Sequence, residues 1–122
     1  MNSASTYAFY GSLRRGMINY LEFETSLDFL YQEIIAGYRM YAMESFPYAV
    51  KTDKKTDLIT VEVFRITNPE VERAIHRLEM DEGYYYDEII IRDAKIGIYL
   101  YHHAGPDPLV KSGDWVNFFG LT

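Results

Sequence analysis

The pattern of apolar and polar residues predicts a chain dominated by short β-strands. The strands are expected in residues 7–10, 32–50, 58–66, 84–92 and 96–103. These segments are rich in β-branched and aromatic residues, and glycine, proline or charged residues separate them. Residues 18–31 follow neither the strand nor the helix period, so we expect a short helical or irregular connection there. Gly37 predicts a sharp bend, which suits strands that curl into a barrel.

Two polar connections are short enough to be hairpin turns. The charged segment 51–57 leads into the strand at 58–66, and Asp93-Ala94-Lys95 joins the last two strands. We therefore expect the strands on either side of each connection to pair with one another.

One helix is predicted from Asn68 to about Met80. Asn68 can accept hydrogen bonds from the free amides at the helix start, Pro69 fits the first helical position, and Glu70 suits the positive end of the helix dipole. Residues 81–83 end the helix with a glycine. Its inward-facing stripe is expected to consist of Val71, Ala74, Ile75 and Leu78.

Glu79 is placed unusually for a charged residue. It follows Ile75 by four residues and so lies on or beside the apolar face at the C-terminal end of the helix. The helix dipole does not favour a negative charge there, and burial would raise the pKa of the carboxyl group. Two interpretations stay open: a desolvated carboxylate with chemical use, or a glutamate at the margin of the stripe that points into water.

Composition and charge narrow the class of protein. The 122 residues are 48% apolar, which predicts a single domain over residues 1–122. There is no cysteine, and 18 acidic against 12 basic residues give a net charge of −6, which argues against a nucleic-acid partner. Residues 1–6 show no signal pattern and no apolar run could cross a membrane, so we expect a soluble, cytoplasmic protein without a membrane partner. The oligomeric state is left open.

The segment Tyr7–Gly16 carries candidate chemistry in its backbone. A strand that breaks at Gly11 leaves the next N–H groups without ladder partners, and such groups can converge on an anion or a polarised carbonyl group. An ordinary tight turn is the alternative interpretation. Ser12 lacks the sequence surroundings of a nucleophile elbow, so its backbone amide is the better candidate.

No metal or cofactor is expected from the sequence. There is no P-loop and no dinucleotide-binding fingerprint. His102 and His103 are adjacent, so in a strand they would face opposite sides and could not bind one metal ion together, and His76 is the only other histidine.

Several segments together resemble the gamma-glutamylcyclotransferase-like (AIG2-like) family. They are the YGSLRRG sequence of residues 10–16 with Asn19 after it, the SFPYA sequence of residues 45–49, the IHRLE sequence of residues 75–79 before a tyrosine-led strand, and the SGDW sequence of residues 112–115. The likeness extends over essentially the whole chain. It implies an α+β fold, a small mixed β-barrel with one or two flanking helices.

The resemblance also implies roles for particular residues. The substrate-binding loop would be Tyr10, Gly11, Ser12 and Leu13, and Glu79 would be the catalytic base. Tyr86 would help to position the substrate, with Tyr85 as an alternative. Many relatives have a glycine directly after the glutamate, whereas here Glu82 and Gly83 lie downstream, so Glu82 is a rival for the role of the base.

The reaction that the resemblance implies is an intramolecular acyl transfer on a gamma-glutamyl amine or amino acid. The product would be 5-oxoproline, and neither metal nor cofactor would be needed. The alternative is a non-catalytic domain of the same fold that binds a small metabolite or a partner protein. A glutamate that faces a pocket beside the Tyr10–Ser12 loop would favour the enzyme.

Overall fold

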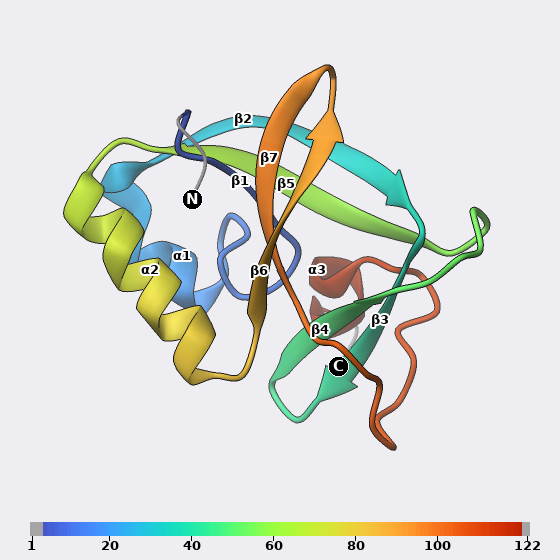
Figure 1. Cartoon of the computed structure of the whole chain (residues 1–122). Coiled ribbons are helices and arrows are strands. Elements are labelled where there is room, and N and C mark those ends of the chain that lie inside the picture. Colours follow the sequence, from blue (N-terminus) through green and yellow to red (C-terminus); the bar gives the residue numbers. More distant parts are fainter. Residues whose placement is uncertain (1–3, 121–122) are drawn as a thin grey trace.

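The computed structural model of the chain describes residues 4–120, and of Phe119 and Gly120 it describes only the backbone (Figure 1). Residues 1–3 of the polar segment at the N-terminus lie outside the described part. The elements are β1 (Thr6–Phe9), α1 (Ile18–Phe23), a 3₁₀ turn (Glu24–Ser26), β2 (Leu27–Ala36), β3 (Tyr38–Met43), β4 (Phe46–Lys51), β5 (Leu58–Ile66), α2 (Pro69–Asp81), β6 (Tyr85–Ile91), β7 (Ala94–Leu100) and α3 (Trp115–Gly120). None of the described helices is long and apolar enough to span a membrane.

The main sheet is mixed and has five strands in the order β2-β5-β1-β7-β6. The short strand β1 lies at its centre, antiparallel to β5 and parallel to β7. Strands β3 and β4 form a separate two-stranded hairpin (Figure 1). The chain therefore mixes strands and helices as expected. Because β1 is the central strand, the segment that follows it starts from the middle of the sheet.

The sheet does not close into the expected barrel, because β2 and β6 are its two edges. Side chains alone link the β6–β7 turn to β2: Arg92 forms an ion pair with Glu33 (Nε to Oε2, 3.0 Å) and stacks over the ring of Tyr31. A surface contact of this kind contributes about 1 kcal/mol or less and does not replace a backbone ladder.

The strand at residues 32–50 differs most from expectation. It starts at Leu27 and is broken into three strands, by Gly37 (φ +90°) and by Glu44 (φ +55°). The sequence pattern does not predict residues 27–31 as strand, because a bulge between Phe29 and Tyr31 interrupts the alternation of apolar and polar residues. The pairing expected across residues 51–57 is confirmed only for residues 32–36, which lie in β2 and pair with β5. The strand next to this connection, β4, pairs with β3 instead.

The last hairpin is confirmed with a small change of turn. Strands β6 and β7 pair from Tyr85 opposite Leu100 to Ile91 opposite Ala94. The turn is Arg92-Asp93, and both residues have positive φ angles of 52° and 65°, which is the type I′ geometry that matches strand twist.

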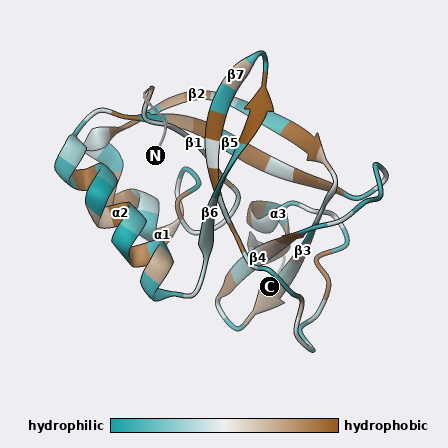
Figure 2. Cartoon of the chain, viewed as in Figure 1, coloured by the Kyte–Doolittle hydropathy of each residue, from teal (hydrophilic) through white to brown (hydrophobic). Residues whose placement is uncertain are grey.

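Helix α2 begins as predicted, with the Asn68 side chain accepting from the amides of Glu70 (2.9 Å) and Val71 (3.4 Å). Hydrophilic residues dominate α2 in Figure 2, and of its apolar stripe only Ile75 is fully buried. Two polar contacts also hold the helix on the sheet: the Tyr7 hydroxyl donates to Glu72, and His76 Nδ1 lies 2.8 Å from the Tyr99 hydroxyl. These contacts fix the position of the helix end that carries Glu79.

Candidate active site

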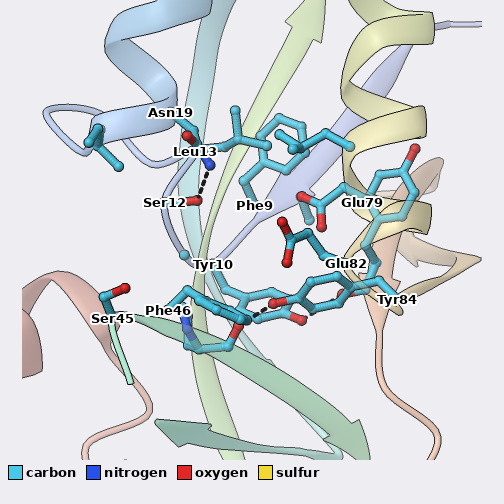
Figure 3. Close-up of a pocket in the computed structure, with 16 residues that line it drawn as sticks. Phe9, Tyr10, Ser12, Leu13, Asn19, Ser45, Phe46, Glu79, Glu82 and Tyr84 are labelled. Carbon is cyan, nitrogen blue, oxygen red and sulfur yellow. Dashed lines mark hydrogen bonds between the residues drawn. The ribbon is translucent and has the colours of Figure 1, made fainter. Parts of the chain in front are cut away.

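A pocket of about 180 Å³ opens where β1 ends. Its walls are residues 8–13, Ile18 and Asn19, residues 45–47 at the start of β4, Leu78, Glu79 and Glu82 at the end of α2, and Tyr84 and Tyr99. A pocket of this size suits a small ligand. Figure 3 shows the side chains that surround it.

The loop Gly11–Arg14 presents unused backbone donors to this pocket. It turns back through a hydrogen bond from the Arg14 amide to the Gly11 carbonyl (3.0 Å), and the Ser12 carbonyl accepts from the amides of Asn19 and Tyr20. Among the hydrogen bonds of residues 4–120, none uses the amides of Gly11, Ser12 or Leu13 as donor. Three consecutive amides are thus available to a carboxylate or a developing oxyanion.

Gly11 and Tyr10 shape the loop by contact with β4. A Cβ atom on Gly11 would lie 2.8 Å from Cγ of Pro47, so only glycine lets the loop approach this strand. The buried Tyr10 hydroxyl donates to the Tyr99 carbonyl (2.6 Å) and accepts from the Ala49 amide (3.0 Å). Tyr10 therefore lines the pocket with its ring, while its hydroxyl group joins β4 to β7.

A buried ion network holds the far side of the loop. Glu62 of β5, only 3% exposed, accepts from Arg14 Nε (2.7 Å), Arg15 Nε (2.9 Å) and the Arg15 amide (3.0 Å). Arg14, also 3% exposed, pairs in addition with Asp114 just before α3 (2.6 Å). The two arginines are thus bound within the chain.

Ser12 contacts Asn19 at the pocket wall. The Asn19 Nδ2 group donates to Ser12 Oγ at 2.7 Å (Figure 3). Because the serine oxygen accepts this bond, its own proton remains available for a ligand. Ser12 consequently offers a hydroxyl donor next to its free amide.

Glu79 points into the pocket from the end of α2, on the side facing the loop (Figure 3). Desolvation by burial, and then the charge of Glu82, raise the pKa of its carboxyl group to about 8. Within the described part of the chain its carboxylate has no hydrogen-bond or ion-pair partner. Glu79 therefore faces the pocket, and its use in chemistry stays a prediction.

Glu82 lines the same pocket but is an exposed residue. Its amide bonds to the carbonyls of Leu78 (3.1 Å) and Glu79 (3.2 Å), and its own carbonyl accepts from the Tyr101 hydroxyl (2.7 Å). Glu82 therefore has a fixed backbone and lies nearer to solvent than Glu79. The deeper carboxylate, Glu79, is the better placed of the two to act as a base.

Tyr84, and not Tyr85 or Tyr86, is the tyrosine of this segment that lines the pocket. Gly83 (φ +95°) reverses the chain after α2, the Tyr84 amide bonds to the Glu79 carbonyl (3.1 Å), and its hydroxyl donates to the Pro47 carbonyl (2.5 Å). Tyr86 packs beside Tyr7 and Tyr99, and its hydroxyl donates to Glu88 (2.7 Å). A substrate role for Tyr86 stays a prediction.

The titratable side chains of the pocket are few. Among residues 4–120 there is no group of three or more His, Asp or Glu side chains arranged to hold a metal ion. The pocket instead combines one carboxylate of raised pKa, a second carboxylate, three free amides and a serine hydroxyl. Such a set suits a ligand that is itself a zwitterion, with an ammonium and a carboxylate group.

Fold and pocket together define a small α+β protein in which a glycine-led loop and a helix-borne glutamate line one pocket. The chain belongs to the gamma-glutamyl cyclotransferase, AIG2-like family, whose sequence model matches residues 7–117. The family resemblance expected from the sequence is therefore confirmed. Among curated proteins no match was found.

Solved structures support the same fold. An uncharacterized protein from Pyrococcus horikoshii is 28% identical with a TM-score of 0.79, over 95% of this chain and 93% of that one. The ytfP protein from Escherichia coli is 24% identical (TM-score 0.69, 93% and 98% covered). An AIG2-like protein from Mus musculus is 15% identical (TM-score 0.67, 84% and 80% covered). The last two similarities concern the fold alone.

Proposed function

We propose that the protein is a cyclotransferase that converts gamma-glutamyl amines or amino acids to 5-oxoproline and a free amine. The observation that carries the proposal is that Glu79, with its raised pKa, and the free amides of Gly11–Leu13 line one small pocket. Membership of the family supports this reaction, and a base and hydrogen-bond donors are the groups that the reaction would need from the pocket.

The substrate has an α-ammonium, an α-carboxylate and a γ-amide. In the proposed mechanism the ammonium lies at Glu79, and the loop amides with Ser12 bind the carboxylate or the γ-carbonyl oxygen. Glu79 takes a proton from the ammonium, and the freed amine attacks the γ-carbonyl carbon. The new C–N bond closes the five-membered ring, and the ring nitrogen then gives up a second proton. The old amide C–N bond breaks, and the amine takes up both protons and departs as an ammonium ion.

The pKa of Glu79 suits this proton transfer. A value of about 8 is much closer to the pKa of an amino group than the usual glutamate value of 4.5 is, so the free-energy cost of taking a proton from the ammonium is lowered. The loop donors would stabilise the oxyanion of the tetrahedral intermediate. Because nucleophile and electrophile belong to one molecule, the pocket needs only to select the folded conformation of the substrate.

The test is to incubate the purified protein with a panel of gamma-glutamyl amines and amino acids and to quantify 5-oxoproline by mass spectrometry. Glu79→Gln should lower kcat by about 10²- to 10⁴-fold. Glu70→Gln is the matched control, since Glu70 is an exposed acid on the same helix outside the pocket. Equal rates for Glu79→Gln and the parent protein would disprove the assigned base. Ligand-induced thermal stabilisation without product would favour the binding-only alternative.

A further inference from the structure

The charge of the pocket is one-sided. Glu79 and Glu82 are the only charged residues among those that line it, and no lysine, arginine or histidine takes part. The nearest basic residues along the loop do not compensate, because Arg14 and Arg15 are bound by Glu62 behind it. A gamma-glutamyl head group brings one ammonium, which can compensate one of the two carboxylates.

Glu82 lies where the rest of the substrate would leave the pocket. In the proposed mechanism the head group would lie between the loop amides and Glu79, so the leaving amine would extend towards solvent. Glu82 is exposed, and Ile18, 78% exposed, lines the same pocket, as does the half-buried Phe46. The mouth therefore combines apolar surface with one carboxylate that the head group does not use.

We propose that Glu82 forms a subsite for a positively charged group on the leaving amine, so that the preferred substrates are gamma-glutamyl derivatives of amines with a second, distal ammonium group. This inference rests on the proposed function and adds the part of the substrate that the reaction itself does not specify. Ile18 and Phe46 would contact the methylene chain between the amide and the distal ammonium. A leaving group with a carboxylate, as in gamma-glutamyl amino acids, would be repelled.

Three synthetic probes of equal length test the charge preference: the gamma-glutamyl amides of 1,5-diaminopentane, hexylamine and 6-aminohexanoate. They end in an ammonium, a methyl and a carboxylate group, respectively. We expect kcat/KM to fall in that order, with a ratio of about 2 to 5 between the first two, the size expected for a solvent-exposed charge pair. Raising NaCl from about 0.05 M to about 0.5 M should reduce this ratio, because salt screens exposed charges.

Glu82→Gln assigns the preference to one residue. The ratio of kcat/KM for the ammonium probe to that for the methyl probe should fall towards one in this variant. Asp81→Asn removes the same charge from the adjacent exposed residue, which does not line the pocket, and should keep the ratio. Using a ratio cancels any effect that either variant has on Glu79.

The outcomes separate the two proposals. If all three probes yield 5-oxoproline at equal rates, or if Glu82→Gln keeps the ratio, the subsite is disproved while the cyclotransferase stands. If no probe yields 5-oxoproline, the cyclotransferase proposal fails. In that case thermal stabilisation by the three probes still tests the subsite, and equal shifts in melting temperature would overturn it.

Discussion

Two glutamates lie on opposite sides of the loop Gly11–Arg14, and their surroundings differ. Glu62 lies behind the loop, almost completely buried, and accepts three hydrogen bonds from Arg14 and Arg15. Glu79 lies in front of the loop, is less buried, and has no partner except the like charge of Glu82 nearby. Burial alone therefore does not mark a reactive carboxylate.

The difference lies in where compensation comes from. Around Glu62 the chain supplies the positive charges, so the carboxylate is fixed and unreactive, and its neighbours hold the loop to β5 and to the start of α3. Around Glu79 none of the residues described as lining the pocket carries a positive charge. The partners of the two glutamates thus differ: Glu62 holds the loop in place, and the proposed role of Glu79 depends on its lack of a positive partner among the pocket residues.

Removing Arg14 tests most directly how much the partners of Glu62 contribute to stability. Arg14→Ala would leave Glu62 and Asp114 without their buried partner, and we expect a loss of about 3–5 kcal/mol in the free energy of unfolding. Urea denaturation measures it. Arg15→Ala is the control, because Arg15 is 46% exposed and its amide bond to Glu62 survives; it should cost about 1 kcal/mol or less. Equal losses would show that the buried network has no special role.

Glu79→Gln should have the opposite sign. The pKa of Glu79 is about 8 in the folded protein against a model value of 4.5, so the folded state holds a proton that the unfolded state has released between these values. The parent protein therefore loses stability as pH rises through 8. The variant avoids this loss and should be more stable by roughly 1–3 kcal/mol at pH 9, with little difference at pH 4.

Urea denaturation at both pH values checks this prediction. Glu62→Gln is the matched comparison, since it should destabilise the protein by weakening its bonds to the two arginines. Stability that is equal for Glu79→Gln and the parent protein at pH 9 would mean that Glu79 is not desolvated in solution.

The sequence was informative where a single local rule decides the structure. Asn68 and Pro69 predicted the helix start, and the spacing from Ile75 predicted Glu79 on or beside the apolar face of the helix. Pattern failed where long-range contacts decide: the bulge after Phe29 hid the start of β2, and the strand next to residues 51–57, β4, pairs with β3 rather than with β5.

The candidate site shows the same division. The loop and Glu79 follow from local motifs, whereas Tyr84 enters the pocket only because Gly83 reverses the chain. The pairing of Arg14 with Glu62 and Asp114 joins residues 48 and 100 positions apart, and no sequence spacing predicts it. From the sequence alone, Arg14 and Arg15 are two adjacent positive charges whose partners are not evident.

The smallest expected effect concerns the influence of Glu82 on Glu79. Desolvation is the larger cause of the raised pKa of Glu79, and the charge of Glu82 is the smaller. The other titratable groups that interact with Glu79 are tyrosines that stay neutral because their own pKa values are raised: Tyr10, Tyr84, Tyr99 and Tyr101. In the parent protein kcat/KM should rise with pH to a plateau above about 8, as the base loses its proton. Glu82→Gln should move this midpoint down by less than about one pH unit.

The hexylamide probe suits the measurement because its leaving group is uncharged, and Asp81→Asn controls for net charge. A midpoint that does not move would show that water screens the two carboxylates from each other, and Glu79 would then owe its reactivity to burial alone.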